Sequence, residues 1–174
     1  MVDRTAVEVI RLATGHGLRV AVAESLTGGL LAGELVSVPG ASLAFSGGVV
    51  AYDTSLKRSL LGVDAELLAR RGPVDAEVAM QMAAGVRRAC AVPRDPRGLD
   101  EPAAADIGLA TTGVAGPDPD PQTGQPAGTV WLGISSARGD RAVELRLSGD
   151  RAQIRAATVS AALTLLCGEL SGDS

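Results

Sequence analysis

The chain has 174 residues, of which 46% are hydrophobic and 21% are charged, and its formal net charge is −4. This composition favours one globular domain over residues 1–174 and excludes a disordered chain. Because it has no block of Lys or Arg and no uniformly apolar stretch of membrane-spanning length, we expect neither nucleic acid nor a membrane as a partner. Cys90 and Cys167 lack a partner motif and His16 is the only histidine, so we expect a reduced, cytoplasmic protein without a metal site.

The first half of the chain alternates between predicted helices and predicted strands. Helical spacing of apolar residues predicts a helix over 3–16, and a strand follows over 19–24. A turn at 25–29 leads into a helix over 30–36, which ends before a second strand over 45–52. Strands separated by helices are typical of parallel pairing, so we expect these two strands to lie parallel in one sheet.

The second half adds three helices, a charged loop, a strand, a long loop, a hairpin and a final helix. In chain order these span residues 54–61, 64–70, 75–91, 93–102, 107–112, 113–127, 128–136 with 142–147, and 150–166. The hairpin predicts an antiparallel strand at one side of the sheet. The fold class that we expect is therefore α/β, a three-layer α/β/α sandwich with a mixed, mostly parallel sheet.

The sixteen Lys and Arg residues include a single lysine, Lys57. Arginine does not release its proton in proteins, whereas lysine can when its surroundings disfavour the charge. Lys57 lies in the first turns of a helix that Asp53 or Thr54 would cap, and both the helix N-terminus and the uncharged sequence upstream disfavour an ammonium group. A neutral Lys57 amine could take a proton from a serine, but a solvated lysine left by compositional bias explains the pattern about equally well.

The turn that follows the first strand contains Ser25, Thr27, Gly28 and Gly29 and opens a helix. Free backbone N–H groups and the helix dipole suit a phosphate or a developing oxyanion, and the two hydroxyl groups could add donors. The motif matches neither the Rossmann nor the Walker pattern. On pattern alone, an ordinary capped strand–helix turn is the favoured interpretation.

Two more segments combine a loop with polar side chains. Thr112 and Gly113 follow a buried strand, and ligands of α/β proteins bind at the carboxyl ends of strands. Asp150 is expected to cap the last helix, so Arg151 could hold a phosphate or carboxylate with two hydrogen bonds. A loop kept for its turn chemistry and a solvated arginine are the structural alternatives.

These segments, in this order and spacing, resemble the C-terminal domain of the CinA family. The matching segments are 23–29, 38–42, 48–52 with Lys57, 60–63, 72–74, 112–117, 126–130 and 149–151. The resemblance covers nearly the whole chain and implies a three-layer domain that forms homo-oligomers. It also implies an amidase that hydrolyses nicotinamide mononucleotide to nicotinic acid mononucleotide and ammonia, with no cofactor and no metal.

By position, the resemblance makes Ser42 the nucleophile and Lys57 its base. It makes Ser25, Tyr52, Thr112 and Arg151 residues that bind substrate or assist the chemistry, with the phosphate near Gly28 and Gly29 or against Arg151.

The chain departs from the family pattern at Leu26, where Cys is usual, at Ala41, where Ser is usual, and at residues 74–76. The first two departures put substrate affinity in question more than chemistry. Two other classes of function remain open: a non-catalytic nucleotide-binding module, and an interaction protein linked to competence or DNA damage.

Overall fold

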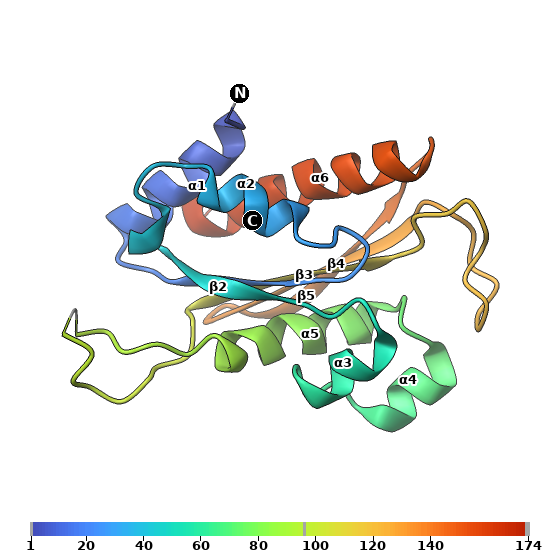
Figure 1. Ribbon diagram of the computed structural model, residues 1–174, viewed down its shortest axis with the longest axis horizontal. Helices are drawn as coiled ribbons and strands as arrows, with labels where there is room; N and C mark the ends of the chain where they lie inside the picture. Colours follow the sequence, from blue (N-terminus) through green and yellow to red (C-terminus); the bar gives the residue numbers. More distant parts are fainter. Residues whose placement is uncertain (1, 96, 173–174) are drawn as a thin grey trace.

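The computed structural model describes residues 2–95 and 97–172, which form a central sheet between two layers of helices (Figure 1). The sheet order is β2-β1-β3-β4-β5. The strands are β1 (Val20–Glu24), β2 (Phe45–Val50), β3 (Ile107–Gly113), β4 (Thr129–Ser136) and β5 (Gly139–Arg146). β1 pairs parallel with β2 and β3, whereas β4 pairs antiparallel with β3 and β5. The predicted three-layer fold with a mixed sheet is confirmed.

One helical layer contains α1 (Arg4–Gly15), α2 (Leu30–Val36) and α6 (Arg151–Ser171). The other contains α3 (Thr54–Ser59), α4 (Ala65–Arg71) and α5 (Ala76–Ala89), on the opposite face of the sheet (Figure 1). A short 3₁₀ turn, η1 (Ala41–Leu43), precedes β2. An aspartate side chain caps the start of five of these helices, namely α1, α3, α4, α5 and α6. These caps include the predicted ones at Asp53 and Asp150 and explain where those helices begin.

Glycines in the sheet let the backbone of α5 pack directly against the backbones of β3 and β4. A Cβ on Gly108 in β3 would collide with the carbonyl oxygen of Ala83, and one on Gly133 in β4 would collide with that of Ala79. The core around this contact consists mainly of Ala, Val, Leu and Met side chains. A chain with 2% aromatic residues thus fills its interior by close backbone packing rather than by large rings.

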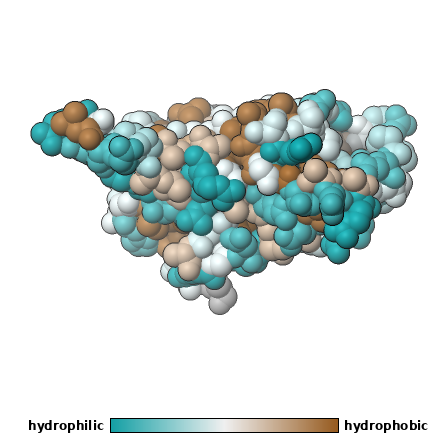
Figure 2. Space-filling model, turned by 90° about the horizontal axis from the view of Figure 1, so that it is seen from below, coloured by the Kyte–Doolittle hydropathy of each residue, from teal (hydrophilic) through white to brown (hydrophobic). Residues whose placement is uncertain are grey.

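Several elements differ from their predicted bounds, α6 and β5 by the most residues. α6 continues to Ser171 rather than ending near residue 166, and Gly172 in a left-handed conformation terminates it. The predicted loop at 93–102 projects from the body, as Figures 1 and 2 show, but its base is paired through a bridge between Val92 and Ala103.

Within the described residues, α6 is the one helix whose length and composition would also suit a membrane span. Its buried residues include Ile154, Leu163 and Leu166, and it packs on α1, α2 and the sheet. This packing accounts for its apolar character as that of a core helix.

Candidate functional site

A cavity of about 470 Å³ opens at the carboxyl ends of β1, β2 and β3. Ser25 follows β1, Tyr52 follows β2, and Thr112 lies at the end of β3. Lys57 from α3, Arg151 from the start of α6 and Gly113 at the end of β3 complete the group of sequence-predicted residues that line it. Six candidates from five separate segments therefore meet at one edge of the sheet, where ligands of α/β proteins bind.

Lys57 and Ser25 form the polar floor of this cavity. Lys57 is only 1% exposed, and its Nζ donates to the Oγ of Ser25 at 3.0 Å and to the carbonyl oxygen of Ala51 at 3.0 Å. Burial lowers the pKa of Lys57 to about 8, and the nearby carboxylate of Asp53 opposes this shift. A substantial fraction of Lys57 is therefore a neutral amine near pH 8, positioned to accept the proton of the Ser25 hydroxyl.

The backbone around Ser25 is fixed by an internal carboxylate. Glu24, the last residue of β1, is 1% exposed, and its side chain accepts hydrogen bonds from the backbone N–H groups of Gly29, Leu31 and Ala32. The start of α2 thus already holds a negative charge supplied by the chain itself. Of the two phosphate positions that we expect, the one beside Gly28 and Gly29 is disfavoured, because the Glu24 carboxylate already accepts from the N–H groups at the start of α2, and the one against Arg151 stays a prediction.

Thr27 also lies outside the cavity. Its hydroxyl is fully buried and shares a 2.8 Å hydrogen bond with the hydroxyl of Thr111 in β3, so it ties the turn to the sheet. Gly28 and Gly29 have φ values of 58° and 96°, a left-handed conformation that glycine adopts without strain. These glycines are explained by the shape of the turn, which is the structural alternative that the sequence pattern favoured.

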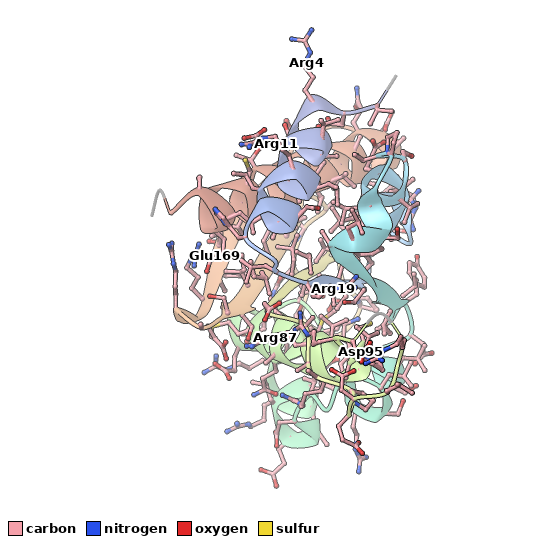
Figure 3. The ribbon with its side chains drawn as sticks, turned by 90° about the vertical axis from the view of Figure 1, so that its left-hand side faces the viewer. Arg4, Arg11, Arg19, Arg87, Asp95 and Glu169 are labelled. Atoms are coloured by element: carbon pink, nitrogen blue, oxygen red, sulfur yellow. The ribbon has the colours of Figure 1, made fainter. Side chains whose placement is uncertain are left out.

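Ser42 lies at the other end of the sheet. It belongs to η1, which precedes β2, and its carbonyl oxygen accepts a hydrogen bond from Arg19 Nη1 at 2.7 Å. Figure 3 views this end of the molecule and labels Arg19. The six residues of β2 rise about 3.3 Å each, which separates the two ends of the strand by about 20 Å. The predicted Ser42–Lys57 pair is therefore not formed, and Ser25 is the serine beside Lys57.

Tyr52 and Arg151 meet across the mouth of the cavity. Arg151 donates from Nη2 to the hydroxyl of Tyr52 at 2.8 Å and from Nη1 to the carbonyl oxygen of Gly116 at 3.0 Å. Thr112 donates its hydroxyl proton to the carbonyl oxygen of Pro73 at 2.6 Å. Gly113 lines the cavity too, but a Cβ there would collide with neighbouring β4, so packing explains the glycine.

Four residues near the cavity were not among the predicted site residues. Asp118 and Asp120 line it, from a segment in which prolines alternate with aspartates over residues 117–121. Glu24 and Arg155 hold the Ser25 turn, Arg155 by donating to the carbonyl oxygens of Leu26 and Thr27. The proline–aspartate alternation directly after a buried strand was the signal that could have identified the first two.

The arrangement suits nucleophilic attack by a serine that a buried amine activates. The residues that line the cavity include two carboxylates, Asp118 and Asp120, and one guanidinium, that of Arg151. Among residues 2–95 and 97–172, no group of three or more His, Cys, Asp or Glu side chains is placed to hold a metal ion.

Comparison with known proteins identifies the family. The family described as the CinA C-terminal domain matches residues 2–170. A CinA-like protein from Frankia casuarinae is 46% identical over 164 residues, which cover 94% of this chain and 34% of that protein. The chain thus spans about a third of the length of the curated relatives that it matches.

Solved structures give the same result. Competence damage-inducible protein A from Klebsiella pneumoniae superposes with a TM-score of 0.84 at 30% identity, covering 98% of this chain and 97% of that one. Competence/damage inducible protein CihA from Agrobacterium tumefaciens gives a TM-score of 0.79 at 33% identity and covers 98% of both chains. The chain therefore belongs to the CinA C-terminal domain family.

Proposed function

We propose that this chain is an amidase that hydrolyses nicotinamide mononucleotide to nicotinic acid mononucleotide and ammonia. The observation that carries the reaction type is the buried Lys57 amine, 3.0 Å from the Ser25 hydroxyl at the floor of an open cavity. The resemblance of the sequence to CinA C-terminal domains supports the substrate. In this proposal Ser25, and not Ser42, is the nucleophile.

The reaction begins with proton transfer from Ser25 to neutral Lys57. The freed Oγ attacks the carboxamide carbon and forms a tetrahedral oxyanion. The protonated Lys57 then gives its proton to the departing nitrogen, the C–N bond breaks and ammonia leaves. A water molecule, deprotonated by the same amine, hydrolyses the ester that links the acyl group to Ser25, and this step restores the free serine.

The charges that line the cavity support a pyridine nucleotide as the substrate. Nicotinamide mononucleotide combines a cationic pyridinium ring with an anionic phosphate. Asp118 and Asp120 could stabilise the ring, while Arg151 could hold the phosphate by exchanging its bonds to Tyr52 and Gly116. With the start of α2 filled by Glu24, Arg151 is the phosphate anchor in this proposal.

The test is ammonia release from nicotinamide mononucleotide by the purified chain in the presence of a chelator. The Ser25→Ala variant should lose the activity, and Ser42→Ala, which changes a serine at the far end of the sheet, should keep it. Activity that survives Ser25→Ala would remove the proposed nucleophile. Nucleotide binding without any ammonia release would instead indicate a binding module.

A further inference from the structure

Within the described part of the chain, the turn that carries Ser25 leaves a backbone donor at the cavity without an acceptor. The N–H of Ser25 donates to Thr111, and those of residues 28–32 donate to Ser25, Thr27 or Glu24. The N–H groups of Leu26 and Thr27 have no acceptor among the described residues, and of these two residues only Leu26, which is 3% exposed, lines the cavity. Buried N–H groups without a partner are rare in folded proteins, so a ligand atom in the cavity is a natural acceptor for the N–H of Leu26.

Arg155 holds the two peptides that follow Leu26 and Thr27. From α6, its Nε donates to the carbonyl oxygen of Leu26 at 2.8 Å and its Nη2 to that of Thr27 at 2.9 Å. The Thr27 carbonyl shares a planar peptide with the N–H of Gly28, which donates to the carbonyl oxygen of Ser25 at 3.1 Å. The Ser25 carbonyl in turn shares a peptide with the N–H of Leu26, and in a trans peptide the two groups point in opposite directions. Arg155 therefore fixes the direction of the Leu26 N–H through one intervening hydrogen bond.

We infer that Arg155 is a positioning residue that fixes the Leu26 N–H group as an oxyanion donor beside Ser25. This inference rests on the proposed function, because it concerns the tetrahedral state formed at Ser25. A donor on the residue after the nucleophile is well placed for that oxygen. Arg155 itself touches no reacting atom; it acts by holding the turn that carries the donor.

A planar guanidinium suits this role better than an amine would. Arg155 spans two successive carbonyl oxygens with two N–H groups in fixed geometry, whereas the single nitrogen of lysine cannot reproduce that fork. Glu24 fixes the far end of the same turn through three N–H groups. The turn that follows Ser25 is thus held by side chains from both β1 and α6.

The test compares the full chain with Arg155→Met and Arg155→Lys. We expect Arg155→Met to lower kcat about 100-fold while KM changes little, since oxyanion donors act on the transition state. Arg155→Lys should recover only part of the loss, and added guanidinium ion should restore activity to Arg155→Met. Arg146→Met, which removes an exposed arginine on β5 that donates to the hydroxyl of Thr129, is the control and should leave kcat unchanged.

A second readout does not depend on turnover. Pyridine-3-boronic acid would form a tetrahedral anionic adduct with Ser25, so its affinity should fall about as much as kcat in Arg155→Met. Binding of nicotinamide mononucleotide to Ser25→Ala should not change when Arg155→Met is added. Boronate affinity equal to that of the unmodified chain in both Arg155 variants would overturn the inference.

The experiments distinguish failure of the proposed amidase function from failure of the inference about Arg155. If the unmodified chain binds the boronate but releases no ammonia, the proposed function fails, and the boronate comparison still decides the role of Arg155. If ammonia is released and the Arg155 variants lose substrate binding and kcat equally, without guanidinium rescue, Arg155 is only structural. Arg155→Lys provides the comparison if Arg155→Met does not fold.

Discussion

The Nζ of Lys57 lies 3.0 Å from the Oγ of Ser25, although 32 positions separate the two residues in the chain. Ser25 follows β1 and Lys57 follows the neighbouring parallel strand β2 by seven residues. Parallel pairing brings the carboxyl ends of both strands to one edge, and the Asp53 cap starts α3 there. The pair is therefore a product of strand order rather than of a local motif.

Replacement of Lys57 tests its role as a base. Lys57→Met should lower kcat at least about 1,000-fold, because the Ser25 hydroxyl loses its proton acceptor. The fold should persist, since methionine fills similar space without a buried amine. Arg58→Met, on the exposed side of the same helix, is the control for helix stability and should retain activity. An active Lys57→Met variant would contradict the mechanism.

Activity should depend on pH through Lys57. Only the neutral amine accepts a proton, so kcat/KM should rise with pH and level off above about pH 8, the pKa of Lys57. The Asp53 carboxylate raises this pKa, so Asp53→Asn should move the profile to lower pH while the asparagine still caps α3. A profile that stays in place, or moves to higher pH, would show that another group controls the rate.

Stability should also depend on pH through Lys57. Its pKa is about 8 in the folded chain, below its ordinary value of 10.5, so the unfolded state binds more protons between these two pH values. The free energy of unfolding should therefore rise from pH 8 to 10.5, by roughly 3 kcal/mol from this group. Urea unfolding at several pH values measures the slope. Lys57→Met isolates the contribution of this group, because that variant lacks the amine.

Glu24 should contribute strongly to stability. Glu24→Ala removes the acceptor of three N–H groups at the start of α2, and we expect the free energy of unfolding to fall by roughly 3 kcal/mol. Glu24→Gln keeps one accepting oxygen and should cost less. Exposed Glu66→Gln on α4 should change stability by less than about 0.5 kcal/mol. Equal effects at Glu24 and Glu66 would contradict the role described for Glu24.

Asp118 and Asp120 should favour a cationic ring. Reduced nicotinamide mononucleotide keeps the phosphate and the carboxamide but has an uncharged ring, so it isolates this effect. We expect Ser25→Ala to bind the oxidised form several-fold more tightly than the reduced form, with a preference that salt weakens. Adding Asp118→Asn and Asp120→Asn should abolish the preference in calorimetric titrations. Asp140→Asn on β5 is the control, and an unchanged preference in the double variant would remove these carboxylates from recognition.

The sequence predicted most of the fold because periodicity and turn residues carry that information. The order of elements, the Asp53 and Asp150 caps and the antiparallel hairpin were all readable from it. α6 was predicted too short, because no local pattern marked Gly172 as its end.

The site was predicted in part. Lys57, Tyr52 and Thr112 each lie at or after the end of a strand, and the structure brings them together. Ser42 was wrongly paired with Lys57, since it precedes β2 and strand direction alone places it at the other edge. Arg155 could not be found from local pattern, because its partners at Leu26 and Thr27 are almost 130 positions away.

The carboxylate of Glu24 has a consequence for how the protein would behave among competing anions. A bare helix start beside Ser25 would attract inorganic phosphate and nucleotides. The Glu24 carboxylate belongs to the residue before Ser25, so its effective concentration at the start of α2 is one that free anions do not approach. The turn beside Ser25 is therefore insulated from the anion content of its surroundings, and under the proposed function competition by free phosphate would be confined to Arg151 at the mouth of the cavity.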